Sequence, residues 1–199
     1  RVKSMPAVVD HEKRRQQIAG IAADLISRVG LDALTMREIA AAAGYSTTIV
    51  THYFASKRDL LLYTYRASAS NAQGRVNAVL ARDPCDLKGS IEALLPLDEA
   101  RLQDWKVYLA FWQIALVDPD FSAEQRAQAN NARNILQGVL VARAQAGLVP
   151  ADQVETLARR LLVCLVGMAV QAVFDPVDWS GDGQRAFLDA ELRALVGAD

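Results

Sequence analysis

The stretch from Thr35 to Leu60 constrains the fold of this 199-residue chain more than any other. Its pattern predicts two short helices around a tight turn, followed by the start of a longer helix. The apolar residues of the first short helix recur on one helical face: Met36, Ile39, Ala40 and Ala43. Gly44 follows where the chain needs a left-handed residue, which glycine adopts at least cost. Ser46 stands at an N-cap position, where its hydroxyl can accept a hydrogen bond from the next helix.

The second short helix is expected to have a polar outward face. Ile49, Val50 and Tyr53 are expected to pack inward. The outward side chains are then Thr47, Thr48, Thr51 and His52. Helices of this kind enter the DNA major groove in helix-turn-helix proteins. The pattern therefore predicts a DNA-binding unit. A helical ligand-binding or enzymatic domain that uses the motif only for packing would show the same pattern.

Further helices are expected on both sides of the motif. The preceding helix runs from about His11 to Gly30, and its apolar face consists of Ile18, Ile21, Ala22, Leu25, Ile26 and Val29. Ser56 is the expected N-cap of the following helix. Residues 1–9 are expected to be flexible. We divide the chain into an N-terminal arm and three-helix DNA-binding head, residues 1–55, and a helical body, residues 56–199.

The head resembles the TetR family of bacterial transcriptional repressors. The resemblance covers residues 11–62 and depends on Thr35, Ile39, Ala40, Ala43, Gly44, Ser46, Tyr53, Phe54, Lys57 and Leu60. The chain departs from the family at two positions, because many members carry glycine at the position of Thr48 and an aromatic residue at that of Thr51. This departure affects the base contacts rather than the fold.

The resemblance implies a homodimer whose heads reach successive major grooves, about 34–36 Å apart, on a pseudo-palindromic DNA operator. The candidate contacts at the second helix are Ser46, Thr47, Thr48, Thr51 and His52, of which the last four are expected to reach base edges. The candidate phosphate contacts are Lys13, Arg14, Arg15, Thr35, Tyr53 and Lys57. A small-molecule inducer in the body would shift the heads to a separation that no longer fits the operator. The residues do not separate such a repressor from an activator of the same family.

The charge of the chain is unevenly distributed. The net charge is −1, yet residues 1–60 hold nine Lys or Arg against six Asp or Glu, a net +3, which leaves −4 for the remainder. This asymmetry favours attraction of DNA phosphates to the head, although a solvated charged surface would have the same sum.

The cysteines and the apolar runs indicate a cytoplasmic protein. Cys85 and Cys164 are far apart and lack metal-ligand spacing, which fits a reducing compartment. No signal-peptide pattern is present. The longest apolar run, Leu161 to Val170, is too short to span a bilayer, so no membrane segment is expected.

The whole chain is predicted to be all-α. The body helices are expected at 56–82, 86–95, 98–117, 121–146, 150–174 and 184–196. The fifth of these is apolar nearly all round and needs cover on two sides. The last helix adds Phe187, Leu188, Leu192 and Leu195. Together the two helices could form a four-helix interface in a homodimer, as the family resemblance implies, or they could be the core of a monomer.

One body helix concentrates aromatic side chains: Trp105, Tyr108, Phe111 and Trp112. Aromatic residues at helical spacing are more often core than ligand box. The resemblance nevertheless implies a pocket in the body, and segments 94–112 and 174–176 are similar to the choline- and betaine-responsive branch of the family. An aromatic cage attracts a quaternary ammonium ion by cation–π interaction. The expected polar partners of the ligand are Gln113, Gln137 and Gln171.

The chain shows no pattern typical of an enzyme or a metal site. His11 and His52 are its two histidines, and no Ser-His-Asp set, Gly-rich phosphate loop or cysteine cluster is present. Acidic pairs such as Asp118 and Asp120 stand at helix starts, where carboxylates interact favourably with the helix dipole. We therefore expect a regulator that uses no cofactor.

Overall fold

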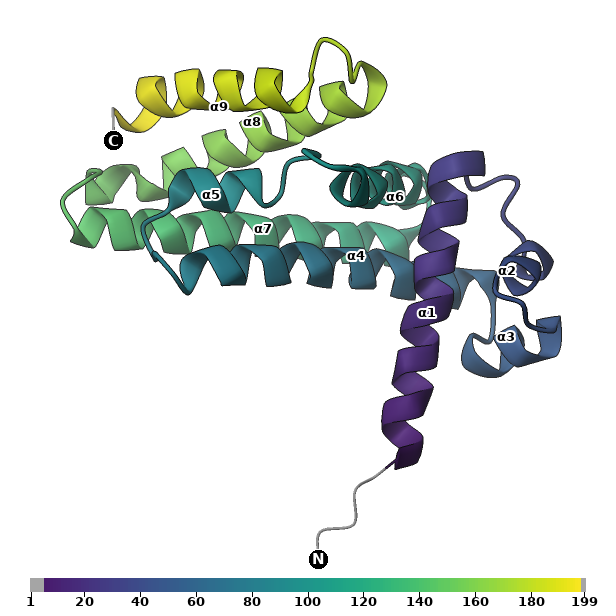
Figure 1. Cartoon of the computed structure of the whole chain (residues 1–199). Coiled ribbons are helices and arrows are strands. Elements are labelled where there is room, and N and C mark those ends of the chain that lie inside the picture. The colour runs from purple at the N-terminus through teal and green to yellow at the C-terminus, as the bar shows by residue number, and fades with distance from the viewer. Residues whose placement is uncertain (1–5, 198–199) are drawn as a thin grey trace, which may run out of the picture.

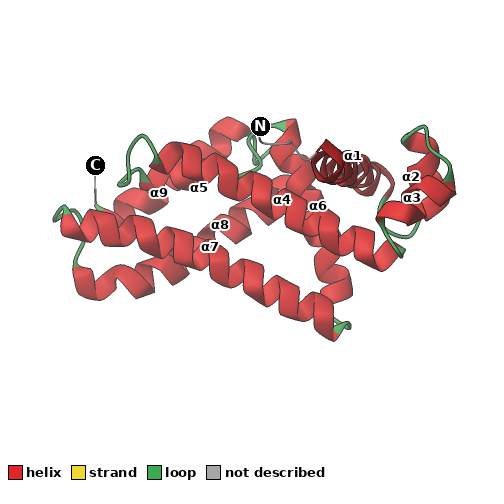
Figure 2. Ribbon diagram, turned by 90° about the horizontal axis from the view of Figure 1, so that it is seen from below, coloured by secondary structure: helices red, strands yellow, loops and turns green. Residues whose placement is uncertain are grey.

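The computed structural model describes residues 6–197, and every regular element in that range is helical, which confirms the all-α class (Figure 1). The elements are α1 (Pro6–Val29), α2 (Met36–Ala42), α3 (Thr47–Tyr53), α4 (Lys57–Leu80), α5 (Leu87–Glu92), α6 (Glu99–Ala115), α7 (Pro119–Gln145), the 3-10 turn η1 (Ala151–Gln153), α8 (Val154–Phe174) and α9 (Gly181–Val196). In two perpendicular views α2 and α3 lie at one end of an elongated molecule (Figures 1 and 2). The head is therefore well separated from the far end of the body.

Short-range hydrogen bonds fix the helix-turn-helix. The Thr35 hydroxyl accepts from the Glu38 N–H at 3.2 Å, and the Glu38 carboxylate accepts from the Thr35 N–H at 2.8 Å, which forms a capping box at α2. Gly44 has a left-handed φ of +68° in the turn. The Ser46 hydroxyl accepts from the Ile49 N–H at 3.3 Å and caps α3. The expected Ser46 cap and the turn glycine are confirmed, and so is the expected Ser56 cap, whose hydroxyl accepts from the Asp59 N–H at 3.1 Å. The Thr35 capping box was not predicted.

Three expectations about the head need correction. Ile49 is 42% exposed rather than inward, because α3 directs the side chain of Val50 to the core and that of the adjacent Ile49 to solvent. Val29 is 52% exposed, since the last turn of α1 runs past the core. Finally, α1 already begins at Pro6. Of the nine residues expected to be flexible, residues 6–9 are thus helical, and residues 1–5 lie outside the described range.

One apolar cluster joins the head to the body. From the head it includes Ile18, Ala22, Ile26, Ile39 and Val50, from α4 it includes Leu60, Leu61 and Tyr65, and from α6 and α7 it includes Val107, Phe111 and Phe121. Because this packing is continuous, a movement of α6 bears directly on the core of the head. The boundary at residue 55 stays a prediction from the sequence.

A second apolar cluster fills the body and draws on α5, α6, α7, α8 and α9. Several helix bounds differ from the expected ones: α5 ends at Glu92 rather than at residue 95, α7 begins at Pro119 rather than at residue 121, and both α8 and α9 begin elsewhere. Ser180 caps α9 by accepting from the Gly183 N–H at 3.2 Å, so α9 begins at Gly181. Residues 151–153 form a 3-10 turn rather than the first turn of α8. None of these changes moves the apolar face of α8.

The segment Ala151–Phe174 is, by length and composition, apolar enough to cross a membrane, and its most apolar 18-residue window has a mean hydropathy of 1.8. The ten-residue run Leu161 to Val170 is too short for this, but Leu157 and Ala158 before it and Ala172, Val173 and Phe174 after it extend the apolar stretch. A core helix of a soluble protein has the same properties. Only 39% of its most apolar window is buried within the chain. Val163, for example, is 73% exposed. Much of α8 is therefore apolar and uncovered within one copy of the chain.

Candidate DNA interface and ligand cavity

The outward face of α3 presents the side chains that the sequence predicted. Thr47, Thr48, Thr51 and His52 are all exposed. The Thr51 hydroxyl donates to the carbonyl oxygen of Thr48 at 3.1 Å, so its oxygen can still accept a further hydrogen bond. Exposed Ile49 adds an apolar group to this face. The face can offer hydroxyl, imidazole and methyl groups to a base edge.

Aromatic contacts hold α1 against α3. The His11 ring lies 4.7 Å from the Tyr53 ring between centroids, and the His52 ring lies 5.3 Å from it. His11 and His52, which lie far apart in sequence, are therefore neighbours with ring centroids 6.1 Å apart. Tyr53 is half-buried in this cluster and fixes the end of α3 that follows the outward residues.

Arg14 and Arg15, which are expected to reach phosphates, place their guanidinium groups over aromatic rings. The Arg14 guanidinium lies over the Tyr45 ring, 5.3 Å from its centroid, and bonds to the Tyr45 hydroxyl. The Arg15 guanidinium lies 4.8 Å from the ring centroid of Phe54 and 4.6 Å from that of Tyr63. These cation–π contacts tie α1 to the residues on either side of α3. Both side chains are half-buried, whereas Lys13 is exposed.

Lys57 and Arg58 also have partners within the chain. The Lys57 ammonium donates to the carbonyl oxygen of Leu31 at 2.8 Å. The Arg58 guanidinium bonds to both carboxylate oxygens of Asp118, and its second terminal nitrogen lies 2.8 Å from Asp120. Arg58 thereby lowers the pKa of Asp118 to about 2. Two carboxylates at the start of α7 thus offset a positive charge at the start of α4, close to the head.

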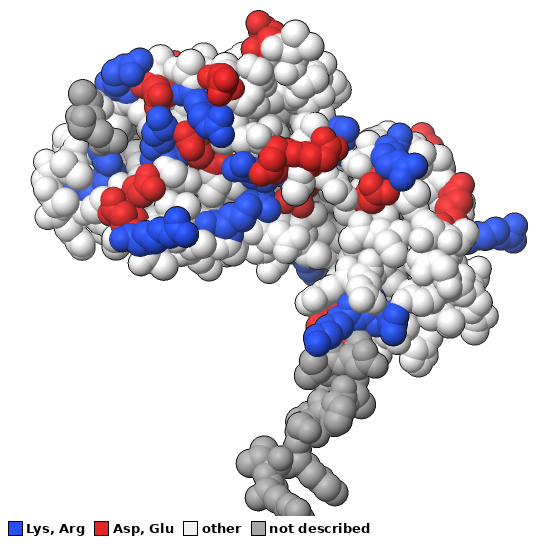
Figure 3. Space-filling view, in the orientation of Figure 1, with Lys and Arg blue, Asp and Glu red and all other residues white. Residues whose placement is uncertain are grey.

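The surface charge reflects this pairing. On the face seen in Figure 3, acidic and basic side chains alternate over the body, whereas most of the surface over α2 and α3 is uncharged. Exposed Lys13 and Arg37 are the cations of the head that project most clearly to solvent beside this region. The positive charge near α3 is therefore weaker than the count over residues 1–60 suggests.

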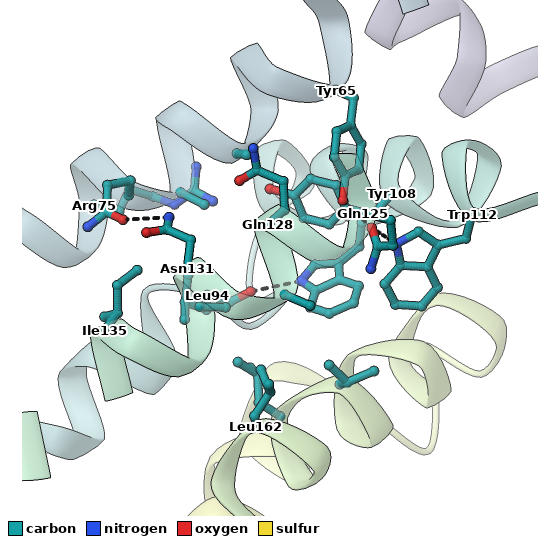
Figure 4. A pocket seen from close by; sticks show the side chains of 18 residues that line it. Tyr65, Arg75, Leu94, Tyr108, Trp112, Gln125, Gln128, Asn131, Ile135 and Leu162 are labelled. Carbon is teal, nitrogen blue, oxygen red and sulfur yellow. Dashed lines mark hydrogen bonds between the residues drawn. The ribbon is translucent and has the colours of Figure 1, made fainter. Parts of the chain in front are cut away.

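A cavity lies between α4, α6, α7 and α8 (Figure 4). The centre of a water molecule can occupy about 140 Å³ of it. The aromatic residues of its wall are Tyr65, Trp105, Tyr108 and Trp112, and the polar residues are Gln73, Arg75, Gln125, Gln128 and Asn131. Alanines of α4 and α7 and aliphatic side chains of α8 complete the lining. A mostly apolar cavity with a few polar groups is typical of a small-molecule site.

Three aromatic rings of α6 are set at steep angles to one another. Trp105 and Tyr108 have ring centroids 5.5 Å apart and planes inclined by 79°. Trp105 and Trp112 have centroids 6.3 Å apart and planes inclined by 85°. The Trp105 indole N–H donates to the carbonyl oxygen of Leu94 at 2.8 Å, which fixes its ring. Such rings can surround a compact group from more than one side.

A buried ion pair sets the electrostatics beside the cavity. Arg75 donates to Asp104 at 3.0 Å and to the carbonyl oxygen of Ala93 at 3.0 Å. Asp104 is 8% exposed, and burial raises its pKa although Arg75 opposes this. The pKa of Tyr108 is raised by burial first and then by the charge of Asp104, which outweighs that of Arg75. Negative potential therefore reaches the Tyr108 hydroxyl, and this favours a cation there.

Four of the predicted ligand residues, Phe111, Gln113, Gln137 and Gln171, do not line the cavity. Phe111 is 3% exposed and faces the head, with its ring stacked on Tyr65 at 3.7 Å between centroids. Phe111 immediately precedes Trp112 on α6. Because one residue turns a helix by about 100°, the two side chains point to different sides of the helix. Gln171 is exposed on the outer side of α8. Gln113 is also exposed, and Gln137 lines a separate surface groove between α7 and α8.

The cavity residues that the sequence did not reveal come from α4 and α7. On α7 the lining side chains are Gln125, Gln128, Ala129, Ala132 and Ile135, which recur every three or four residues. This stripe of amides and small residues was a possible signal. It does not tell which other helix it faces, because α4 is about 60 positions away in the chain.

The uncovered apolar surface lies along α8 and α9. A surface groove between them is lined by Arg159, Arg160, Val163, Cys164, Gly167, Met168, Trp179, Phe187 and Glu191. Val166, by contrast, lines the internal cavity, and Leu192 is buried in the core. One side of α8 therefore lines the internal cavity, and another side lines the groove at the surface.

An exposed helix-turn-helix on a helical body that encloses an apolar cavity defines a DNA-binding transcriptional regulator. Residues 20–64 match the family model of bacterial regulatory proteins of the tetR family. Residues 86–197, more than half of the chain, match the C-terminal domain of BetI-type transcriptional repressors. The chain thus belongs to the TetR family of transcriptional regulators, with a BetI-type C-terminal domain. The resemblance is confirmed, and members of this family are not enzymes.

Relatives of known name agree with this assignment. The chain is 28% identical to the transcriptional regulator PksA of Bacillus subtilis over 200 residues, which cover 98% of this chain and 96% of PksA. It is 30% identical to the regulator BetI of Escherichia coli K12 over 184 residues, 87% of this chain and 90% of BetI. A crystal structure of a regulator from Saccharomonospora viridis in complex with choline has a TM-score of 0.83. It is 23% identical over 92% of this chain and 96% of its own, and shares the fold.

Proposed function

We propose that the chain is a cytoplasmic repressor that binds a pseudo-palindromic operator as a homodimer and releases it when a small molecule fills the cavity. The observation that carries this proposal is the position of α6. One face of α6 places Phe111 in the core shared with the head, and another places Trp112 on the cavity. A ligand that moves Trp112 therefore acts on the head through the same helix.

The bases are read by α3 in this proposal. Thr47, Thr48, Thr51 and His52 meet base edges, and exposed Ile49 supplies an apolar contact for a thymine methyl. The threonines at 48 and 51, where the family often has other residues, give this chain its own operator preference.

The phosphates are held by residues around α3. Lys13 is exposed and can meet the backbone directly. The other proposed contacts are Arg14, Arg15, Thr35, Ser46, Tyr53 and Lys57, several of which also fix the head. The Lys57 ammonium, for example, gives one hydrogen to Leu31 and keeps two for a phosphate oxygen. Such contacts set position and general affinity rather than sequence preference.

The homodimer is formed through α8 and α9. Support comes from the apolar surface that one copy leaves open, above all Val163 and Phe187 with Gly167 between them in the groove. Gly167 lets a second helix come close. A self-complementary surface of this kind joins two copies around a two-fold axis, as the two halves of an operator require.

The ligand is a small quaternary ammonium compound of the choline type. Steeply inclined rings of Trp105, Tyr108 and Trp112 suit such a cation, and the charge of Asp104 adds negative potential at Tyr108. The structural neighbour bound to choline and the BetI-type domain support the same ligand class.

A gel-shift titration tests the proposed function. The probe is the DNA upstream of the protein's own gene, with random DNA of equal length as control, at fixed salt. We expect specific binding by the dimer and release on addition of choline. If choline instead strengthens specific binding, the protein is an activator that depends on its ligand or a repressor that needs the ligand as co-repressor. Equal affinity for both DNAs would refute an operator-binding role.

A further inference from the structure

The side chain of Gln125 has a fixed orientation in the cavity wall. Its carboxamide oxygen accepts from the Trp112 indole N–H at 2.6 Å and also from the Tyr65 hydroxyl. The Trp112 indole N–H can only donate, so the oxygen and not the nitrogen of the amide must face it, and the Tyr65 hydroxyl then donates to the same oxygen. Figure 4 shows the amide nitrogen of Gln125 pointing away from the Tyr65 hydroxyl. Gln125 of α7 is thus held by residues of α4 and α6, and its NH2 group points away from both of them.

Two other amides of the cavity wall already have an acceptor within the described chain. The Gln128 amide donates to Glu124 at 2.9 Å, and the Asn131 amide donates to Gln73 at 3.2 Å. For the Gln125 amide nitrogen, the described residues contain no acceptor within hydrogen-bond distance. This nitrogen is also absent from the set of fully enclosed polar atoms without partners, so it is not sealed off, and Gln125 lines the cavity.

We propose that Gln125 is the polar recognition residue of the cavity and donates its amide N–H to an oxygen of the ligand. This inference rests on the proposed ligand-binding function and makes it more specific. The ligand is then a quaternary ammonium ion that also carries an acceptor oxygen. Because Trp112 both borders the aromatic rings and bonds to Gln125, the cationic group and the oxygen must be separated by a short spacer.

The lining leaves the Gln125 N–H to the ligand oxygen. Among the described residues that line the cavity, Arg75 carries a charge and is paired with Asp104, and none is Asp or Glu, so no carboxylate competes with the ligand oxygen for the Gln125 N–H. A ligand without the oxygen would leave this N–H unpaired when it displaces water. Loss of such a hydrogen bond weakens binding roughly tenfold.

Two ligands and three proteins test the assignment. The ligands are (2-methoxyethyl)trimethylammonium, which has an ether oxygen, and n-butyltrimethylammonium, which has a CH2 group in its place and the same charge. The proteins are the wild type, Gln125→Glu and Gln137→Glu. The Gln125→Glu variant keeps an acceptor for Tyr65 and Trp112 but replaces the NH2 donor with an oxygen. The Gln137→Glu variant makes the same charge change on α7, outside the cavity.

Isothermal calorimetry should show that the wild type and Gln137→Glu prefer the ether by about tenfold. In Gln125→Glu this preference should vanish or reverse, while the butyl compound still binds. If Gln125→Glu does not fold, as judged by circular dichroism, Gln125→Met removes the same donor and should show the same loss. Equal binding of both ligands by the wild type, or an unchanged preference in the Gln125 variant, would overturn the role of Gln125 alone. Binding of neither ligand by the wild type would instead refute the quaternary ammonium cavity, and this inference with it.

Discussion

The helix-turn-helix and the cavity are both held by hydrogen bonds to side chains, but these bonds span very different lengths of chain. In the helix-turn-helix and at the adjoining start of α4, the capping bonds of Thr35, Ser46 and Ser56 each reach a backbone N–H three residues ahead. In the cavity, Gln125 bonds to Tyr65, 60 residues earlier in the sequence. The head is therefore shaped by its own short segment, whereas the cavity exists only when four helices of the body have packed.

This difference fits the proposed roles of the two regions, in which the head reads DNA and the body binds the ligand. A DNA-reading surface must keep its shape while it moves as a unit, and local caps achieve this. A ligand site that must alter the packing of several helices is better built from contacts between them. Helix α6 belongs to both systems, since Phe111 packs with the head cluster and Trp112 lines the cavity.

The largest expected effect comes from breaking the link between two copies. Val163→Glu places a carboxylate on the exposed apolar side of α8. The charge would be desolvated in the apolar contact between two copies, so sedimentation should show monomers. Operator affinity should fall roughly 100-fold or more, because the two heads no longer bind as one unit. The matched control is Val141→Glu, on an exposed position of α7, which should remain dimeric. A dimeric Val163→Glu with normal operator affinity would contradict the interface.

Next in size is a comparison of the two faces of α6. Phe111→Ala should destabilise the protein by about 3–5 kcal/mol, because it leaves a hole in the core shared by head and body. Its ligand affinity, measured below the melting temperature, should change little. Trp112→Ala should instead abolish the choline-induced rise in melting temperature and keep DNA binding, provided that it folds. The opposite pattern, with choline response lost in the Phe111 variant and kept in the Trp112 variant, would reverse our assignment of the faces.

A smaller effect tests whether the head is stabilised by its own local hydrogen bonds. Ser46→Ala removes the cap of α3 and should cost about 1 kcal/mol of stability. The loss should appear as faster amide hydrogen exchange in α2 and α3, with exchange in the body unchanged. Ser46→Asp restores an acceptor and should recover the wild-type exchange. Slower or unchanged exchange in α3 of the alanine variant would show that this cap is dispensable.

The smallest effect concerns the ion pair between the start of α4 and the start of α7. Arg58 lowers the folded-state pKa of Asp118 to about 2, below its unfolded value. Its contribution to stability is therefore fully present above about pH 4 and is lost as the pH falls towards 2. In Asp118→Asn, denaturant titrations should show a shallower loss of stability over this pH range than in the wild type. Identical pH profiles would mean that Arg58 and Asp118 do not interact in solution.

The sequence predicted those parts of the molecule that depend on near neighbours. Gly44, Ser46 and Ser56 could be assigned because a cap or a left-handed turn involves residues three or four positions apart. The side that a long helix turns to its neighbours was harder to predict. Ile49 is apolar yet exposed, since a short helix at the surface need not bury each apolar residue.

The cavity illustrates the limit more clearly. Trp105, Tyr108 and Trp112 could be chosen from their spacing, but Phe111 could not be separated from them by composition alone. Gln125 escaped notice because its two partners come from α4 and α6, and only the packed body brings them together. In the same way, the apolar residues of α8 do not tell which of them face the cavity, as Val166 does, and which face outward.

The most direct test of the account is the affinity of choline for the free protein and for the protein saturated with operator DNA, measured by calorimetry under the same salt. If the cavity and α3 are coupled through α6, operator DNA should weaken choline binding. The factor should equal that by which choline weakens operator binding, because binding linkage is reciprocal. A choline affinity that is the same with and without the operator would show that the cavity does not control DNA binding.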